Sequence, residues 1–221
     1  MLRYLLPLGL VAVGCGPGVD SDLVGETSSA LGRRVIEKTR TKAELADAVF
    51  SSFDPVTCIQ SDVQLFVNRS WNRYNGELSE FSENAFLATI RLTPCDGEPI
   101  IVGQGVSEDI DFTMSANERR ARLRVSSFPF TDLTHSVDLN LNVDIRWEGI
   151  GVAETEEFNE SFVDPDTGNT TTTRYRARFN DAVATGVISN GTENWIPEPS
   201  ISSTLRRETL VSVTRTPRPT R

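Results

Sequence analysis

The sequence predicts an all-β protein, an antiparallel β-sandwich of about nine strands with at most one short N-terminal helix. Two observations carry this prediction. Apolar and polar residues alternate along most of 41–221, which is the period of a strand with one buried face. Turn signals divide the same region into short segments, among them Asn-Gly at Asn75 and at Asn190. Many strands joined by turns, with almost no helix, are typical of an antiparallel sandwich or barrel.

The N-terminal end of this region has two interpretations. Thr41 and Glu44 match a helix capping box, and Leu45, Ala48 and Val49 would share one helical face. A short helix over 42–49 is one possibility. A first strand over 48–52 is the other, because its apolar residues also suit a sheet.

The clearest strand is 137–147, where every odd position is apolar and every even position is polar. The apolar set is Val137, Leu139, Leu141, Val143, Ile145 and Trp147; the polar set is Asp138, Asn140, Asn142, Asp144 and Arg146. This alternation predicts one buried and one solvated face. Gly149 and Gly151 then shift the apolar parity, which predicts a bulge or a tight bend.

Shorter strands are predicted on either side of this one. They cover 63–67, 86–92, 100–102, 110–114, 121–125, 152–163, 171–180, 182–189 and a segment within 203–213. The segments 152–163 and 171–180 form a hairpin whose register is set by cross-strand pairs. Phe158 is expected opposite Tyr175 or Ala177, and Glu157 opposite Arg176 or Arg178. In this register, the numbers of two residues that lie opposite each other add up to an odd value.

The first fifteen residues have the pattern of a secretory signal. Arg3 supplies a positive charge, 4–13 is a short apolar run, and small residues lead to Cys15. The run is about ten residues long, roughly half of what a helix needs to cross a bilayer. Residues 11–15 resemble the lipobox of bacterial lipoproteins, with Ala12 where that pattern prefers leucine.

This resemblance implies that 1–14 is a signal peptide cleaved after Gly14 and that the Cys15 thiol is acylated. Residues 15–40, rich in turn formers, would be a flexible tether, followed by a single β-domain over 41–221 with a frayed C-terminal tail. Gly16 stands where an aspartate would signal retention in the inner membrane. The expected location is the cell envelope, lipid-anchored, in the outer rather than the inner membrane.

Two further cysteines remain if Cys15 carries lipid. Cys58 and Cys95 then form an even pair in an oxidising compartment, which predicts a disulfide. Each lies beside one of two sequential strands that would place them at the same sheet edge. A metal site with two thiolates and His135 is the alternative, and it would use the chain's single histidine.

The formal net charge of −9 argues against nucleic acid, or an anionic membrane surface, as a partner of the body of the protein. There is no later run of eighteen apolar residues, so membrane attachment would come from the Cys15 lipid. The protein or glycan partner is left open.

No catalytic residue and no cofactor is predicted. The chain contains no Gly-x-Ser-x-Gly, Ser-x-x-Lys or His-Glu-x-x-His motif. His135 would need a nucleophile within reach, and the adjacent Ser136 would point to the opposite face of a strand. A turn or strand-edge histidine is the simpler interpretation.

Three polar groups offer alternatives. Asp164, Asp166 and Asn169 could ligate calcium or could form an ordinary hairpin turn. The acidic run Glu154, Glu156, Glu157 and Glu160 could supply hydrolase carboxylates or a solvated strand face. The polar side of 137–147 could bind a sugar or a cation.

The functional prediction is a lipid-anchored, non-catalytic surface or periplasmic module with a binding or structural role. The alternatives are a carboxylate-dependent hydrolase and a small-ligand carrier with a β-barrel interior. A hydrolase needs converging ionisable groups in a pocket. A carrier needs an empty apolar lumen.

Overall fold

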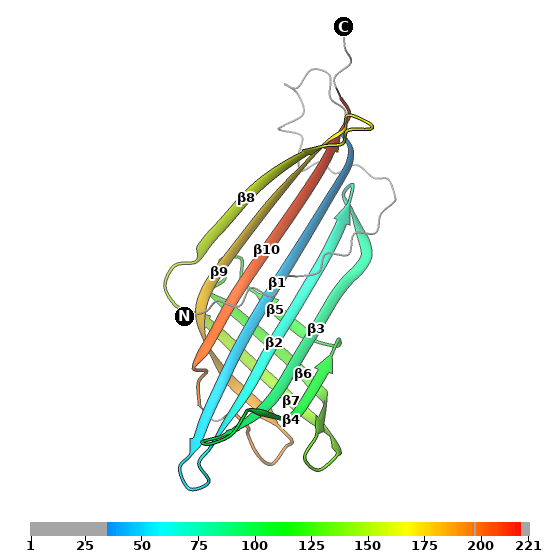
Figure 1. The fold of residues 1–221 in the computed structure, drawn as a ribbon. Helices are drawn as coiled ribbons and strands as arrows, with labels where there is room; N and C mark the ends of the chain where they lie inside the picture. Colours follow the sequence, from blue (N-terminus) through cyan, green and yellow to red (C-terminus); the bar gives the residue numbers. More distant parts are fainter. Residues whose placement is uncertain (1–34, 197, 218–221) are drawn as a thin grey trace.

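The computed structural model describes residues 35–196 and 198–217, and in this part of the chain all regular structure is antiparallel β-sheet (Figure 1). The strands are β1 Val35–Asp54, β2 Ile59–Tyr74, β3 Glu77–Pro94, β4 Ile100–Ser107, β5 Asp111–Met114, β6 Arg120–Asp132, β7 Val137–Gly149, β8 Glu154–Val163, β9 Thr170–Ser189 and β10 Ser202–Arg215. The predicted all-β antiparallel class is confirmed. None of the described residues lies in a helix long and apolar enough to cross a membrane.

The ten strands belong to one sheet that closes on itself. Its order is β10-β1-β2-β3-β4-β6-β7-β9, and β9 pairs back with β10; β8 adds to β9, and β5 adds to β6. The two facing layers expected of a sandwich are therefore two walls of one ring-like sheet. β9 joins the walls, because its first half pairs with β10 and its second half with β7. The segments 171–180 and 182–189, predicted as separate strands, are the two halves of β9.

Apolar side chains fill the ring. The largest fully buried ones are Trp147, Phe86, Phe128, Leu123, Leu141, Ile145, Ile188, Ile196, Leu205 and Val67. The odd-position prediction for β7 holds for Leu141, Val143, Ile145 and Trp147, while Val137 at the strand start is 46% exposed. The interior is a packed core, with aromatic contacts such as Phe86 against Phe128 at 4.6 Å between ring centroids.

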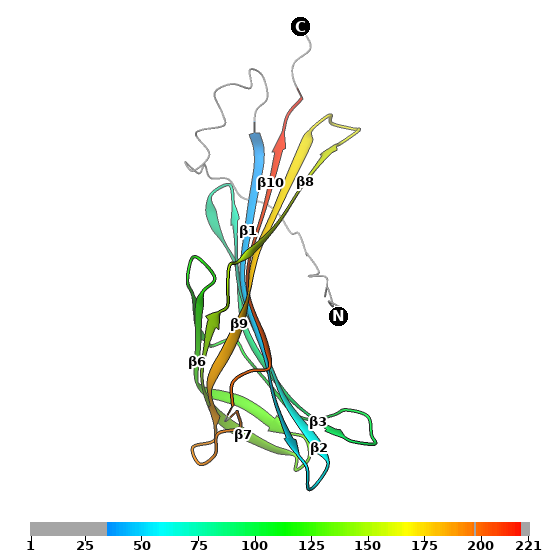
Figure 2. The same ribbon diagram turned by 90° about the vertical axis from the view of Figure 1, so that its left-hand side faces the viewer.

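β1, β9 and β10 continue far beyond this core. With β8 and the β2–β3 hairpin they form a single-layered sheet that projects from the ring (Figures 1 and 2). The first residue of β1 and the last residue of β10 lie at the far end of this projection (Figure 1). We call it the projecting sheet.

The long β1 corrects one expectation and decides between two alternatives. Residues 35–40, placed in the tether, form the first part of β1. Residues 42–49 are strand and not helix, despite the capping-box pattern of Thr41 and Glu44. The physical reason is that β1 pairs along nearly its whole length with both β2 and β10, and this satisfies backbone groups that a helix would satisfy internally. The Cys15 assignment and 1–14 lie outside the described residues.

The hairpin register is confirmed. Phe158 lies opposite Tyr175, with ring centroids 5.1 Å apart, and Glu157 lies opposite Arg176 with a 2.9 Å ion pair. The aromatic pair occupies one face of the hairpin and the ion pair the other.

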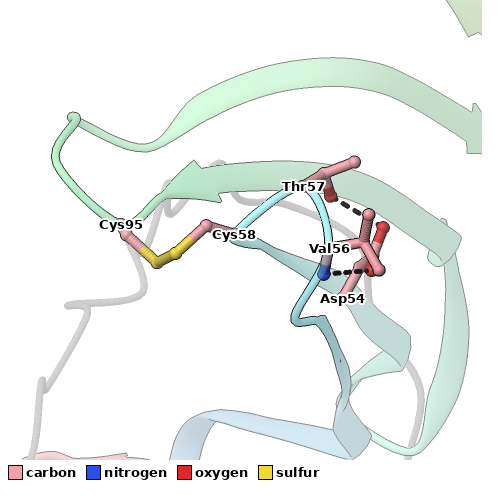
Figure 3. The surroundings of a disulfide bond; sticks show 5 residues. All are labelled: Asp54, Val56, Thr57, Cys58 and Cys95. Carbon is pink, nitrogen blue, oxygen red and sulfur yellow. Dashed lines mark hydrogen bonds between the residues drawn. A yellow bond between two sulfur atoms is a disulfide. The ribbon is translucent and has the colours of Figure 1, made fainter.

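The disulfide is confirmed as well. Cys58 and Cys95 are bonded, with Cα atoms 5.6 Å apart (Figure 3). The bond joins the turn before β2 to the end of β3, and the Cys95 amide donates to the Cys58 carbonyl at 3.0 Å. Asp54 closes the same turn by accepting from the Val56 amide and the Thr57 hydroxyl. The bond ties the β1–β2 turn to the end of β3, at the end of the sheet opposite the first residue of β1.

Candidate functional site

The projecting sheet has two faces of opposite charge. One face continues the surface that lines the core, and the pairing register places cationic side chains on it from β1, β2, β9 and β10. They are Lys38, Arg40, Lys42, Arg69, Arg73, Arg174, Arg176, Arg178, Arg207 and Arg215. We call this surface the basic face. Among the side chains that the structure describes, its strand carboxylates are Glu44 and Glu157, and Glu118 reaches it from the β5–β6 turn.

The other face carries the acids. On β1, β8, β9 and β10 it presents Glu37, Asp47, Glu154, Glu156, Glu160, Asp181 and Glu208, with Arg206 among them. Burial raises the pKa of the Asp47 carboxyl, which accepts a hydrogen bond from the Thr204 amide. Side chains alternate across a strand, so this separation follows from the positions of Lys, Arg, Asp and Glu along each strand.

A buried ion network lies where the basic face meets the core. Glu118 is 0% exposed, and its Oε1 accepts a hydrogen bond from Arg207 at 3.0 Å. Its Oε2 lies 3.2 Å from Arg178, and Arg207 also donates to Glu44 at 2.7 Å. Arg207 and Arg178 are direct cross-strand partners, and like charges in such positions repel. Glu118 offsets this repulsion.

The β5–β6 turn that carries Glu118 is anchored from several sides. Arg207 donates to the carbonyls of Met114, Ser115 and Ala116, and Asn180 donates to the Glu118 carbonyl at 3.2 Å. Gly149 allows this close packing, because a Cβ there would lie 2.8 Å from the Glu118 carbonyl oxygen. The turn therefore closes the core with a fixed layer of polar contacts.

A second pair of opposed arginines lies farther out on the basic face. Arg40 of β1 and Arg73 of β2 are direct cross-strand partners. Among the described residues no carboxylate lies within ion-pair distance of either side chain. With Lys42 and Trp71 they line a hollow of about 220 Å³.

Two features show an electrostatic cost at this hollow. The Arg40 Nε atom is buried and has no hydrogen-bond partner among the described residues. Burial, followed by the neighbouring charges of Arg40 and Arg73, lowers the pKa of the Lys42 ammonium group. Lys42 lies 5.9 Å from the centre of the Trp71 ring, and Arg69 lies 5.8 Å from it, which partly offsets the crowding of charge.

The residues considered for metal binding form a compact turn. Asp164 accepts hydrogen bonds from the Asp166 amide at 2.9 Å and the Thr167 hydroxyl at 2.5 Å. These bonds lower the pKa of the Asp164 carboxyl, with the Thr167 bond as the main cause. Asn169 follows Gly168, whose φ of 68° closes the turn. Among the described residues no group of three His, Cys, Asp or Glu side chains could hold a metal ion.

The other polar candidates are separated from one another. On β7, Asp144 is bound by Arg122 and Asp138 accepts from Thr131, so neighbours on β6 satisfy them. In the acidic run of β8, Glu157 lies on the basic face and the rest lie on the opposite face. His135 is exposed in the β6–β7 turn and contacts Asp132 at 2.8 Å.

The basic face was missed at the sequence level, although a signal was present. Cations recur at every second position in 38–42 and 174–178, and Arg69 and Arg73 share one parity on either side of Trp71. This spacing places each set on one face of its strand. Only the register shows that the sets share one face.

Fold and site together describe a closed antiparallel sheet with a projecting, two-faced extension. No protein family and no curated protein matches the chain.

Proposed function

We propose that the protein is a lipid-anchored, non-catalytic module of the cell envelope that binds an anionic ligand through the basic face. The observation that carries this proposal is the collection of cations on one face of a chain whose formal net charge is −9. Charge gathered on one face creates a local field that net charge does not describe. The acidic opposite face would repel an anion, so the sheet would present its basic face to the ligand.

The alternatives of hydrolase and carrier have less support. The carboxylates of β8 lie on two faces of the sheet and are exposed, so they do not converge. The interior of the ring is filled by large side chains, such as Trp147 and Phe86, that are almost fully buried. The basic face is accessible, since Arg69, Arg73, Arg174 and Arg176 are exposed.

Binding to heparin, a generic polyanion, tests the role of the basic face. The triple variant Lys38→Gln, Arg176→Gln, Arg215→Gln is expected to weaken binding by about tenfold or more and to reduce its salt dependence, because fewer ion contacts form. The measurement is affinity at several salt concentrations.

The matched control is Arg91→Gln, Arg120→Gln, Arg146→Gln, which removes the same charge from strands of the ring. It is expected to bind within about twofold of the wild type, since these cations lie off the basic face. Equal losses in the two triple variants would show a net-charge effect and contradict the proposal.

The anchor is tested separately at Cys15. In a bacterial host, Cys15→Ser is expected to abolish incorporation of a fatty-acid analogue and to leave the precursor uncleaved. The double variant Cys58→Ser, Cys95→Ser is the control and is expected to retain the label, because those thiols bond to each other. Wild-type labelling of Cys15→Ser would refute the lipid anchor.

A further inference from the structure

The two opposed arginine pairs on the basic face differ in one respect. Arg207 and Arg178 share the buried carboxylate of Glu118, which the β5–β6 turn inserts between them. Arg40 and Arg73 are paired in the same way, yet no carboxylate of the described residues reaches them. Within the described part of the basic face, one arginine pair therefore has an internal counter-ion and the other has none.

From this difference we infer that the hollow at Arg40, Lys42 and Arg73 is a subsite for a phosphoryl group. The inference rests on the proposed function and names the chemical class of its ligand. A bound phosphoryl group would occupy the position relative to Arg40 and Arg73 that the Glu118 carboxylate occupies relative to Arg207 and Arg178.

The number of cations favours a phosphoryl group over a carboxylate. Three cationic side chains line the hollow, from two adjacent strands. A phosphomonoester carries about −1.5 to −2 charges near neutral pH and three acceptor oxygens, whereas a carboxylate carries one charge and two oxygens. Guanidinium groups donate in a planar fork that matches phosphate oxygens.

The unsatisfied donor points to the same ligand. Arg40 Nε is buried and has no hydrogen-bond partner in the described part of the chain. A buried donor of this kind costs free energy unless it donates to an acceptor. An oxyanion in the hollow supplies acceptor oxygens and reduces the repulsion between Arg40 and Arg73. It would also restore the pKa of Lys42 toward its ordinary value.

Trp71 provides a fluorescence signal for binding in the hollow. It lines the hollow, and Lys42 and Arg69 lie over its ring. Binding of inorganic phosphate to the full chain is therefore expected to change tryptophan fluorescence, and Trp71→Phe is expected to remove that change. Phosphate is also expected to raise the melting temperature of the wild type, because a ligand that binds only the folded state stabilises it.

The variants separate this subsite from the rest of the basic face. Arg40→Gln and Arg73→Gln are each expected to weaken phosphate binding by about tenfold. Arg73→Lys is expected to weaken phosphate binding less, since lysine keeps the positive charge but not the planar pair of donors of a guanidinium group. Arg215→Gln, on the same face but outside the hollow, is expected to bind phosphate within about twofold of the wild type.

The melting temperature in phosphate-free buffer shows whether loss of phosphate binding is due to misfolding of the variant. Arg73→Gln removes a like-charge contact, so its melting temperature in phosphate-free buffer is expected to equal or exceed that of the wild type. A lower melting temperature would mean that Arg73 supports the fold, and it would overturn the assignment.

The source of the phosphoryl group is decided by two arms. The first uses inorganic phosphate, and the second uses phosphatidylcholine vesicles with and without phosphatidate. Binding of inorganic phosphate together with vesicle binding that requires phosphatidate indicates a membrane headgroup as the ligand. Binding of inorganic phosphate without phosphatidate-dependent vesicle binding indicates a soluble phosphate compound.

Failure of this inference is distinct from failure of the proposed function. Acetate binding as tightly as phosphate, or unchanged phosphate binding by Arg40→Gln and Arg73→Gln, would overturn the phosphoryl subsite. Heparin binding that still depends on Lys38, Arg176 and Arg215 would then leave the basic face in place. If phosphate binding did not depend on Arg40 and Arg73, and heparin binding did not depend on the triple substitution either, both the phosphoryl subsite and the proposed function would be overturned.

Discussion

Glu118→Gln is expected to lower the free energy of unfolding by about 3 kcal/mol. Removing one partner of a buried ion pair leaves an uncompensated charge and costs roughly 3 to 5 kcal/mol. The lower value is expected here, because the side chains of Arg207 and Arg178 are 22% and 36% exposed and water screens them in part. Chemical denaturation of the disulfide-bonded protein measures this loss.

The matched control for this substitution is Glu157→Gln. Glu157 forms an ion pair with Arg176 on the same face, but both side chains are more than half exposed. Such a pair contributes less than about 1 kcal/mol. If the two substitutions had the same effect, the network around Glu118 would not be the layer that closes the core.

Leu141→Asp is expected to have the largest effect of any single substitution considered, a loss of several kcal/mol. Leu141 is 1% exposed and lies opposite Phe128 on β6, inside the packed ring. An unpaired carboxylate there would be desolvated without a partner. Because a domain is typically stable by only about 5 to 15 kcal/mol, much of the protein would be unfolded.

The neighbouring residue provides the contrast. Asn142 is exposed on the outer face of β7, so Asn142→Asp is expected to change the free energy of unfolding by less than about 0.5 kcal/mol. Thermal and denaturant unfolding of the two variants can be compared directly. A large loss from Asn142→Asp would contradict the assignment of the two faces of β7.

The charge distribution changes what net charge implies about partners. The value of −9 describes the whole chain and argues against an anionic partner for its body. Pairing of β10 with β1 and β9 brings Lys38, Arg207 and Arg176 onto one face. At physiological salt, charges interact over about 8 Å, so a ligand at this face is affected mainly by the local cations.

Most of the local structure was predictable because it depends on neighbours in sequence. The strand over 137–147, the Phe158–Tyr175 register and the Cys58–Cys95 bond all follow from side-chain periodicity and short-range pairing. The helix expected as one possibility over 42–49 did not form. Capping signals contribute only about 1 kcal/mol, which two long strand partners outweigh.

By itself, the sequence determined the antiparallel all-β class, the disulfide and the alternation that separates Leu141 from Asn142. These depend on a two-residue period and on contacts between consecutive strands. Tertiary structure alone decided that β10 closes the sheet between β1 and β9, and that Glu118 lies between Arg207 and Arg178. It also decided that Arg40 faces Arg73 with no carboxylate of the described residues beside them. Each of these juxtapositions depends on strand order and register, and a register shift of one residue would move every side chain to the opposite face.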